Sequence, residues 1–120
     1  MKLLKWVGSS YKELIKFPEE VRRSMGYALH LAQINERHPH TKTLSGMGSS
    51  KIVEIRENDM SGTYRVVYTL EIQNYVFVLH VFQKKSKSGM STPMQDIEII
   101  NNRLKEARAY YNDIKKGGRQ

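Results

Sequence analysis

The sequence contains no cysteine. This excludes disulfides, thiolate nucleophiles and cysteine-based zinc sites, and it fits a reducing compartment. Long apolar runs are also missing: the longest, Tyr75–Phe82, is interrupted by His80 and falls far short of the roughly 20 residues that cross a bilayer. The apolar core of the N-terminal stretch MKLLKWVGSS is too short for a secretory signal. We therefore expect a cytoplasmic protein with no membrane segment.

Acidic residues are few for a chain of this size. The 120 residues include 20 Lys and Arg against 12 Asp and Glu, which gives a formal net charge of +8 at pH 7. Such an excess in a small domain favours a polyanionic partner, usually nucleic acid, or an acidic protein, whereas solubility alone is the simpler alternative. The length fits one domain. We assign residues 1–114 to that domain and residues 115–120, KKGGRQ, to a frayed basic tail.

Helical patterns occupy the first third of the chain, after a short strand in KLLKWVG. The segment SSYKELIKF has Ser10 as a candidate N-cap and Glu13 three residues later, which is a capping-box pattern. Pro18 suits the first turn of a second helix, which should run to about Glu36. The two helices are expected to form a helical hairpin.

The middle of the chain is rich in strand-forming residues. Residues 37–50 are a loop by composition, and strands follow in KIVEIREN, TYRVVYTLEI and YVFVLHVFQ. A two-residue turn at Gln73 and Asn74 should join the last two strands. A final helix follows, with Thr92 as N-cap, Pro93 in its first turn and one apolar stripe. The order β-α-α-β-β-β-α predicts an α+β fold: a mostly antiparallel sheet with the helical hairpin on one face, and a C-terminal helix.

The turn between the last two strands sets a register that pairs Val67 with His80 and Arg65 with Phe82. Because side chains alternate along a strand, one face of this hairpin is apolar and should pack on the helical hairpin. Its members are Tyr64, Val66, Tyr68, Leu70, Phe77, Leu79 and Val81. The other face carries Arg65, His80 and, if the strand continues, Lys84. A slip of one residue would separate Arg65 from the other two.

Charged residues inside and after these strands describe a candidate site. Arg65 lies within a strand, where a charged side chain needs a water-filled groove or a partner, unless it simply faces solvent. Lys84, Lys85 and Lys87 lie at the end of the last strand. Lysines at such a position can also serve only to prevent pairing of a strand edge with another chain. Together these cations predict a positively charged depression that attracts phosphate.

Two other motifs are weaker candidates. His38 and His40 in HPH suggest a metal, but loop histidines without acidic or cysteine neighbours are usually not ligands, so no metal site is predicted. The stretch GMGSS lacks the strand-then-helix context of a phosphate loop, although Lys42 and Lys51, which flank it, could contact RNA backbone. No cofactor is expected.

Several segments resemble the phage-related branch of the RelE/ParE toxin superfamily, the HigB-like toxins of type II toxin–antitoxin systems. They are YRVVYT, LHVFQKKSKS and TPMQDIE, within a likeness that runs from Leu3 to about Lys105. The resemblance implies a helical hairpin packed on an antiparallel sheet, with a basic groove on the open side. It also implies a ribosome-dependent mRNA endonuclease, or mRNA interferase, that inhibits translation. The partner would be a cognate antitoxin, commonly one with a helix-turn-helix DNA-binding domain.

The same resemblance implies roles for the basic residues. Arg65 matches a strand arginine of the family, and Lys84 and Lys85 match basic residues at the end of its final strand. Metal-free cleavage by attack of the ribose 2′-hydroxyl needs a base, an acid and cations near the phosphoryl oxygens. The three cations would stabilise phosphate charge. His80 would act as base or acid, unless it is a half-buried strand histidine with no such role. The wider set contacting mRNA on the ribosome, or rRNA, is Lys42, Lys51, Arg56 and Lys87.

The chain also departs from the family pattern. No histidine follows His80, and Tyr110 and Tyr111 lie deep in a predicted helix, so no general acid is identified. Two alternatives stay open: a non-enzymatic inhibitor of DNA gyrase like the ParE branch, and a phage-derived binding module without nuclease activity. ParE-like proteins lack the catalytic cations, so the presence of Arg65 and the Lys84–Lys85 pair favours cleavage.

Overall fold

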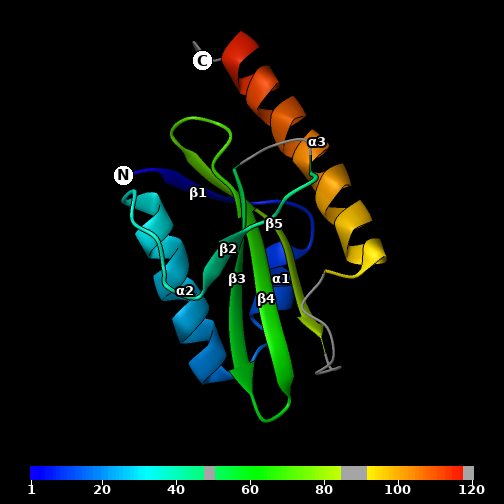
Figure 1. The fold of residues 1–120 in the computed structure, drawn as a ribbon. Coiled ribbons are helices and arrows are strands. Elements are labelled where there is room, and N and C mark those ends of the chain that lie inside the picture. The colour runs from blue at the N-terminus through cyan, green and yellow to red at the C-terminus, as the bar shows by residue number, and fades with distance from the viewer. Residues whose placement is uncertain (48–50, 85–91, 118–120) are drawn as a thin grey trace.

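The computed structural model describes residues 1–47, 51–84 and 92–117, and its elements confirm the predicted α+β class (Figure 1). The strands are β1 (Leu3–Trp6), β2 (Thr41–Thr43), β3 (Ile52–Asp59), β4 (Gly62–Thr69) and β5 (Tyr75–Lys84). The helices are α1 (Ser10–Leu14), α2 (Glu19–Gln33) and α3 (Met94–Lys116). Strand β2 lies inside residues 37–50, which composition had assigned to loop. None of the helices in these ranges is long and apolar enough to cross a membrane.

The strands form one sheet in the order β1-β5-β4-β3-β2. The pairs β2–β3, β3–β4 and β4–β5 are antiparallel. The pair β1–β5 is parallel. The prediction of a mostly antiparallel sheet is therefore confirmed. Strand β4 is the central strand and is buried along most of its length, as expected when both faces of a sheet are covered.

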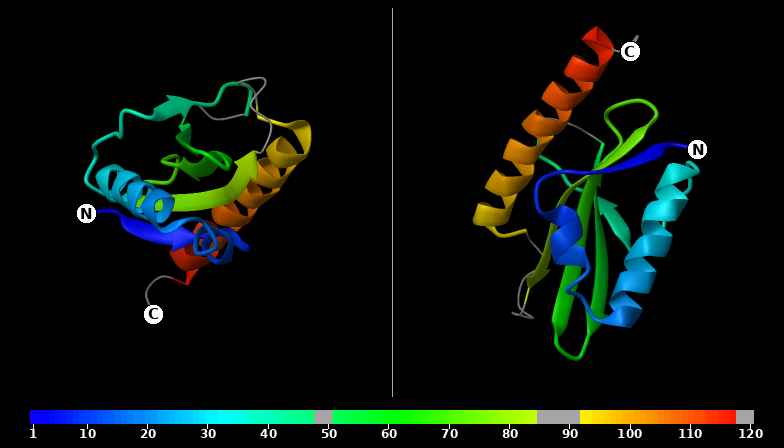
Figure 2. Two further views of the ribbon diagram at one scale, coloured as in Figure 1. Left: turned by 90° about the horizontal axis from the view of Figure 1, so that it is seen from below. Right: turned by 180° about the vertical axis from the view of Figure 1, so that it is seen from behind.

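Helices pack on both faces of the sheet, with α2 and α3 on either side of the strands (Figures 1 and 2). On one face, α1 and α2 bury Leu14, Val21, Met25, Leu29 and Ala32 against Val53, Ile55, Tyr64, Val66, Tyr68, Val76, Val78 and Val81. On the other face, α3 buries Ile100, Leu104 and Ala107 against Ile52, Val67, Phe77 and Leu79. The second face is thus partly covered by α3, rather than open as the resemblance implied.

A β-bulge in β5 changes part of the predicted face assignment. The pairs Val67–His80 and Arg65–Phe82 are confirmed, but the register shifts next to Val67. Such an extra residue reverses the facing of every side chain on one side of it. The prediction was therefore wrong for Phe77 and Leu79, which face α3. Val78 between them faces the helical hairpin.

The connections also differ from the expected ones. Strand β4 ends at Thr69 and β5 begins at Tyr75, so the link is longer than the predicted two-residue turn. Asn74 supplies a left-handed conformation there, with φ of 73°. Helix α2 ends at Gln33 rather than near Glu36. At the C-terminus, α3 includes the first two residues of the predicted tail, and residues 118–120 lie outside the described ranges.

The predicted caps at Ser10 and Thr92 were wrong. Prolines precede α2 and α3 in the N-cap position, and no side chain caps the described helices by a hydrogen bond. Ser10 is instead the first residue of α1; it is fully buried, and its hydroxyl donates to the Val78 carbonyl of β5 at 3.3 Å. This bond ties the first helix directly to the sheet.

Replacing Ser10 by alanine is expected to lower the free energy of unfolding by about 1 kcal/mol, the usual net value of one neutral hydrogen bond. The loss is modest because the Val78 carbonyl keeps the bond from the Val7 amide at 2.9 Å. Chemical denaturation measures the change. Ser45→Ala, at an exposed position, is the control and should leave stability unchanged.

Candidate functional site

Polar side chains gather on the α3 face of the sheet in rows that cross the strands. One row contains Lys42, Glu54, Val67 and His80, and the next contains Arg56, Arg65 and Phe82. Directly paired residues of antiparallel strands point to the same face. Lys84 lies two residues beyond Phe82 in β5 and so follows on this side. We define the sheet–α3 cluster as Lys42, Glu54, Arg56, Arg65, His80, Phe82, Lys84, Thr92, Asp96 and Arg103.

Glu54 is at the centre of the sheet–α3 cluster and is 0% exposed. Its Oε1 accepts a hydrogen bond from Arg56 Nε at 2.7 Å. Its Oε2 lies 3.5 Å from Arg65 Nη1 and accepts a hydrogen bond from the Thr92 hydroxyl at 3.1 Å. A buried carboxylate is tolerated only with such partners. Glu54 therefore joins β3, β4 and the residues ahead of α3.

Arg65 has a partner rather than a water-filled groove. Its side chain is held near Glu54, its guanidinium carbon lies 5.9 Å from the centre of the Phe82 ring, and the residue is only 2% exposed. Burial lowers the pKa of Arg65, and the charge of Glu54 opposes that effect; an arginine nevertheless stays protonated in proteins. The predicted open depression over Arg65 is thus closed in this conformation. Lys42, by contrast, is exposed at the β2 end of the sheet–α3 cluster.

His80 stacks on Phe82, with ring centres 4.8 Å apart, and its Nε2 lies 2.7 Å from Asp96 Oδ1 at the start of α3. Burial lowers the pKa of His80, while the hydrogen bond and charge of Asp96 oppose it. A neutral ring donates Nε2–H to Asp96 and leaves Nδ1 as an acceptor. Arg103 Nη1 is 3.5 Å from that Nδ1. Both ring nitrogens therefore face protein groups.

Arg103 reaches this position past the turn between β1 and α1. It donates to the Leu79 carbonyl at 3.0 Å and to the Ser9 hydroxyl at 3.1 Å. At Gly8, which has φ of 58°, a Cβ would lie 2.7 Å from Arg103 Nε. The backbone conformation favours glycine there, and a larger residue would also displace the Arg103 guanidinium from its hydrogen bonds. Arg103 in this way ties helix α3 to strand β5 and to the turn between β1 and α1, beside His80.

The other sequence-predicted residues are placed less directly. Lys51 precedes β3 and lies about 16 Å along the strand from Arg56, so the register does not bring it to the sheet–α3 cluster. Lys85 and Lys87 lie outside the described residues. A hollow of about 220 Å³ borders the cluster, and Lys42 and Thr92 lie on its wall. Its remaining lining residues are Thr43, Leu44, Ser45, Met47 and Ile97.

Sequence reasoning missed the acidic and bridging members of the sheet–α3 cluster. Glu54 alternates with Val53 and Ile55, which indicates its face but not its burial. Thr92 had been predicted only as a helix cap, and Asp96 had been given no role. Chemically, the described cluster combines exposed and buried cations with two carboxylates, an arrangement that can receive a phosphate at its cationic margin.

Comparison with known proteins gives a consistent family and fold. The family model described as "Phage derived protein Gp49-like (DUF891)" matches residues 12–105. The isolated RelE toxin of E. coli is 26% identical with a TM-score of 0.56, over 72% of this chain and 89% of that one. A mutant of E. coli RelE in the free state is 20% identical with a TM-score of 0.55, over 88% and 96% of the two chains, and supports the fold alone. No curated protein sequence matches the chain.

Proposed function

The chain belongs to the phage-derived Gp49-like family within the RelE toxin superfamily, and from this premise we propose that it is the toxin of a type II toxin–antitoxin system that cleaves RNA. The observation that carries the proposal is the sheet–α3 cluster, which lines up cations from β2 to β5 on one face. We further propose that its substrate is mRNA on translating ribosomes, in the cytoplasm. A cognate antitoxin, of the helix-turn-helix type in HigB systems, would neutralise it.

The proposed reaction is attack of a ribose 2′-hydroxyl on the adjacent phosphorus. The O2′–P bond forms, the P–O5′ bond breaks, a base removes the 2′ proton and an acid protonates the leaving oxygen. Lys42, Arg56 and Lys84 would meet the RNA backbone first, and Lys85 remains a candidate from the sequence. His80 can transfer a proton only after Asp96 or Arg103 releases one ring nitrogen.

Arg65 must become accessible before it can touch a phosphate. Among the described residues, one contact that fastens the segment ahead of α3 to the sheet is the hydrogen bond of 3.1 Å that the Thr92 hydroxyl donates to Glu54. One such bond contributes about 1 to 2 kcal/mol, an amount that the binding free energy of a polyanion at Lys42, Arg56 and Lys84 would have to offset. We propose that RNA binding separates Thr92 from Glu54 and presents Arg65 to the reacting phosphate.

Induced expression of the wild-type protein is expected to stop growth and to produce new 5′ ends within translated messages. Lys84→Gln should reduce the cleavage by about 10- to 100-fold, since it removes a cation from the proposed phosphate site. Mapping of RNA 5′ ends after induction measures both. Lys12→Gln, an exposed lysine of α1, is the control and should cleave normally. Growth arrest without new RNA ends would contradict the nuclease.

A second candidate, a toxin-fold protein that binds without cutting, is favoured by one observation: Arg65 and His80 are both buried and engaged by carboxylates. In that case induction leaves messages intact whatever the growth phenotype. Accumulation of cleaved DNA–gyrase complexes would then identify the ParE-like alternative.

A further inference from the structure

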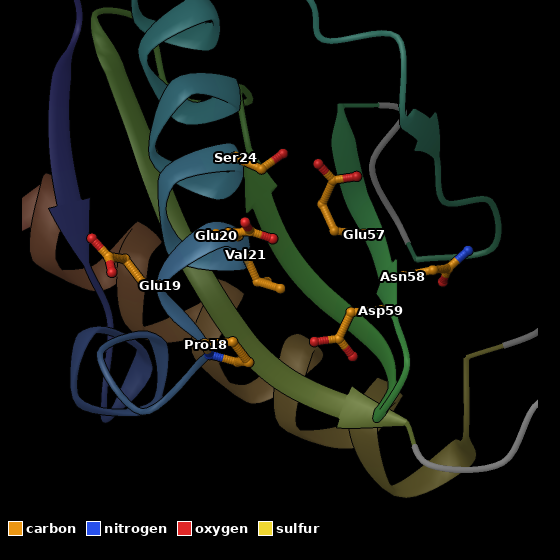
Figure 3. Close-up of a pocket in the computed structure, with 8 residues that line it drawn as sticks. All are labelled: Pro18, Glu19, Glu20, Val21, Ser24, Glu57, Asn58 and Asp59. Carbon is orange, nitrogen blue, oxygen red and sulfur yellow. The ribbon is translucent and has the colours of Figure 1, made fainter.

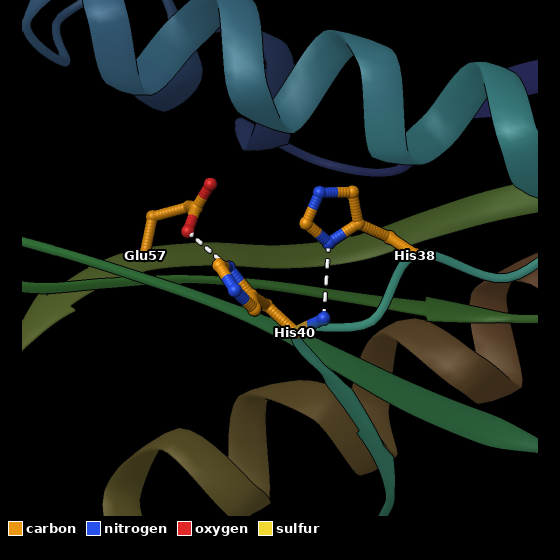
Figure 4. A group of neighbouring side chains, drawn as sticks. All are labelled: His38, His40 and Glu57. Carbon is orange, nitrogen blue, oxygen red and sulfur yellow. Dashed lines mark hydrogen bonds and ion pairs between the residues drawn. The ribbon is translucent and has the colours of Figure 1, made fainter.

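A second group of side chains lies on the α2 face of the sheet, opposite the sheet–α3 cluster. His38 and His40 come from the segment between α2 and β2, and Glu57 comes from β3 (Figure 4). One nitrogen from each imidazole and one carboxylate oxygen lie within 4.8 Å of one another. Glu57 pairs with Tyr64, which packs in the core under α1 and α2. The carboxylate that the sequence motif HPH lacked is thus supplied by a neighbouring strand.

The histidine segment is fixed to the sheet by its own backbone. The Arg56 amide donates to the His40 carbonyl at 2.9 Å, and the Thr41 hydroxyl donates to the His38 carbonyl at 2.8 Å. Arg37 donates to the Thr41 hydroxyl at 2.9 Å. Side chains on a segment held in this way are preorganised relative to a strand residue, as a ligand site requires.

Hydrogen bonds engage the atoms that would bind an ion. His40 Nδ1 lies 2.8 Å from Glu57 Oε1, and the His40 amide donates to His38 Nδ1 at 3.0 Å (Figure 4). A metal ion can replace the proton shared by the imidazole and the carboxylate. The amide bond to His38 is exposed, so water can replace it at little cost. The His40 side chain is 61% exposed, which leaves the ion a path from solvent.

Carboxylates line a hollow beside this group although the chain as a whole is strongly basic. Glu57 also lines a hollow of about 390 Å³ between α2 and β3, together with Glu19, Glu20 and Asp59 (Figure 3). Figure 3 shows the side chains of Glu20 and Glu57 facing each other across the hollow, while Glu19 points away. Carboxylates beside a ligand group raise the local concentration of cations.

We propose that His38, His40 and Glu57 bind one late transition-metal dication of the zinc type, with water completing the coordination. Two imidazoles and one carboxylate with an open position are a donor set that zinc accepts, and other imidazole-seeking ions such as nickel suit it too. Magnesium, which prefers oxygen ligands, does not. A tetrahedral site needs ligand atoms about 3.3 Å apart, and the three ligand atoms, which lie within 4.8 Å of one another, would reach that spacing by small rotations of their side chains. The ion would fasten the histidine segment to β3, independently of RNA binding.

Calorimetric titration of the untagged full-length protein with Zn²⁺ at pH 7.5 is expected to show one ion per chain. His40→Ala and Glu57→Gln should each weaken binding at least about tenfold, as loss of one ligand does. His30→Ala, at an exposed position in the last turn of α2, should bind as the wild type does. Mg²⁺ should give no binding. At pH 5.5 the affinity for Zn²⁺ should fall because protons compete for the imidazoles.

Imidazole ¹⁵N chemical shifts provide the second readout. Zn²⁺ should shift the ring nitrogens of His38 and His40 and leave those of His80 in place. Absence of an ion per chain, or equal binding by the wild type and both ligand variants, would overturn the proposal. Circular dichroism of the variants confirms that the fold is retained, which these partly exposed positions allow.

Discussion

Arg65→Ala is expected to abolish toxicity, with RNA cleavage reduced at least about 100-fold, the usual cost of removing a group that stabilises transition-state charge. The same change should lower the free energy of unfolding by about 2 to 3 kcal/mol. Breaking a buried ion pair by removing one partner typically costs about 3 to 5 kcal/mol. We expect the smaller loss of about 2 to 3 kcal/mol here, because Glu54 still accepts hydrogen bonds from Arg56 Nε at 2.7 Å and from the Thr92 hydroxyl at 3.1 Å. Mapping of mRNA 5′ ends measures the loss of cleavage, and urea denaturation measures the loss of stability.

Stability and activity must be separated, because a variant that fails to fold is also non-toxic. The double variant Glu54→Gln/Arg65→Met removes both charges and keeps the volume, so it should be more stable than Arg65→Ala. We expect it to fold and still not to cleave RNA. Arg65→Lys keeps the charge, but an ammonium lacks the planar group that spans Glu54 and Phe82, so only partial activity is expected. A folded, fully toxic double variant would show that Arg65 is structural only.

The order and the type of the main elements could be predicted because their patterns are local. The alternation of Val53 and Ile55 with Glu54 and Arg56 gives β3 and its two faces, and the apolar stripe gives α3. The bulge beside Val67 has no comparable signal: β5 reads as a continuous strand, and only packing on both faces decides where the extra residue goes. Strand β2 was missed because three polar residues are too few for a periodic pattern.

The placement of two candidate site residues could be predicted for the same reason. The register brought Arg65 and His80 to one face, and β4 and β5 confirm it. The sequence could not supply their counter-charges. Periodicity tells which face a side chain points to but not what covers that face, and the docking of α3 alone brings Asp96 to His80. Glu57 similarly meets His40 only because β2 and β3 are adjacent.

Acidification from pH 7.5 to 5.0 is expected to destabilise the protein, and His80 should account for a measurable part of the loss. Burial holds the pKa of His80 below its ordinary value despite the opposing effect of Asp96. The unfolded chain titrates near about 6.5, so below that pH the unfolded state binds a proton that the folded state excludes. His80's contribution is therefore present above about pH 6.5 and is lost as the pH falls toward the folded pKa, by up to about 1.4 kcal/mol per unit.

The test compares variants rather than absolute values, because other groups also titrate. Within residues 1–47, 51–84 and 92–117, the charged groups that act on His80 are Asp96 and Arg103 of α3 and Glu13 of α1. His80→Gln should lower stability at pH 7.5 through lost packing on Phe82, but it should shrink the difference between pH 7.5 and 5.0. Asp96→Asn removes a charge that raises the pKa of His80, so the folded pKa should fall further. The loss of stability on acidification should then continue to lower pH. His30→Gln, on the exposed surface of α2, should behave as the wild type does. An unchanged pH difference in His80→Gln would mean that the burial of this ring does not account for the loss of stability in acid.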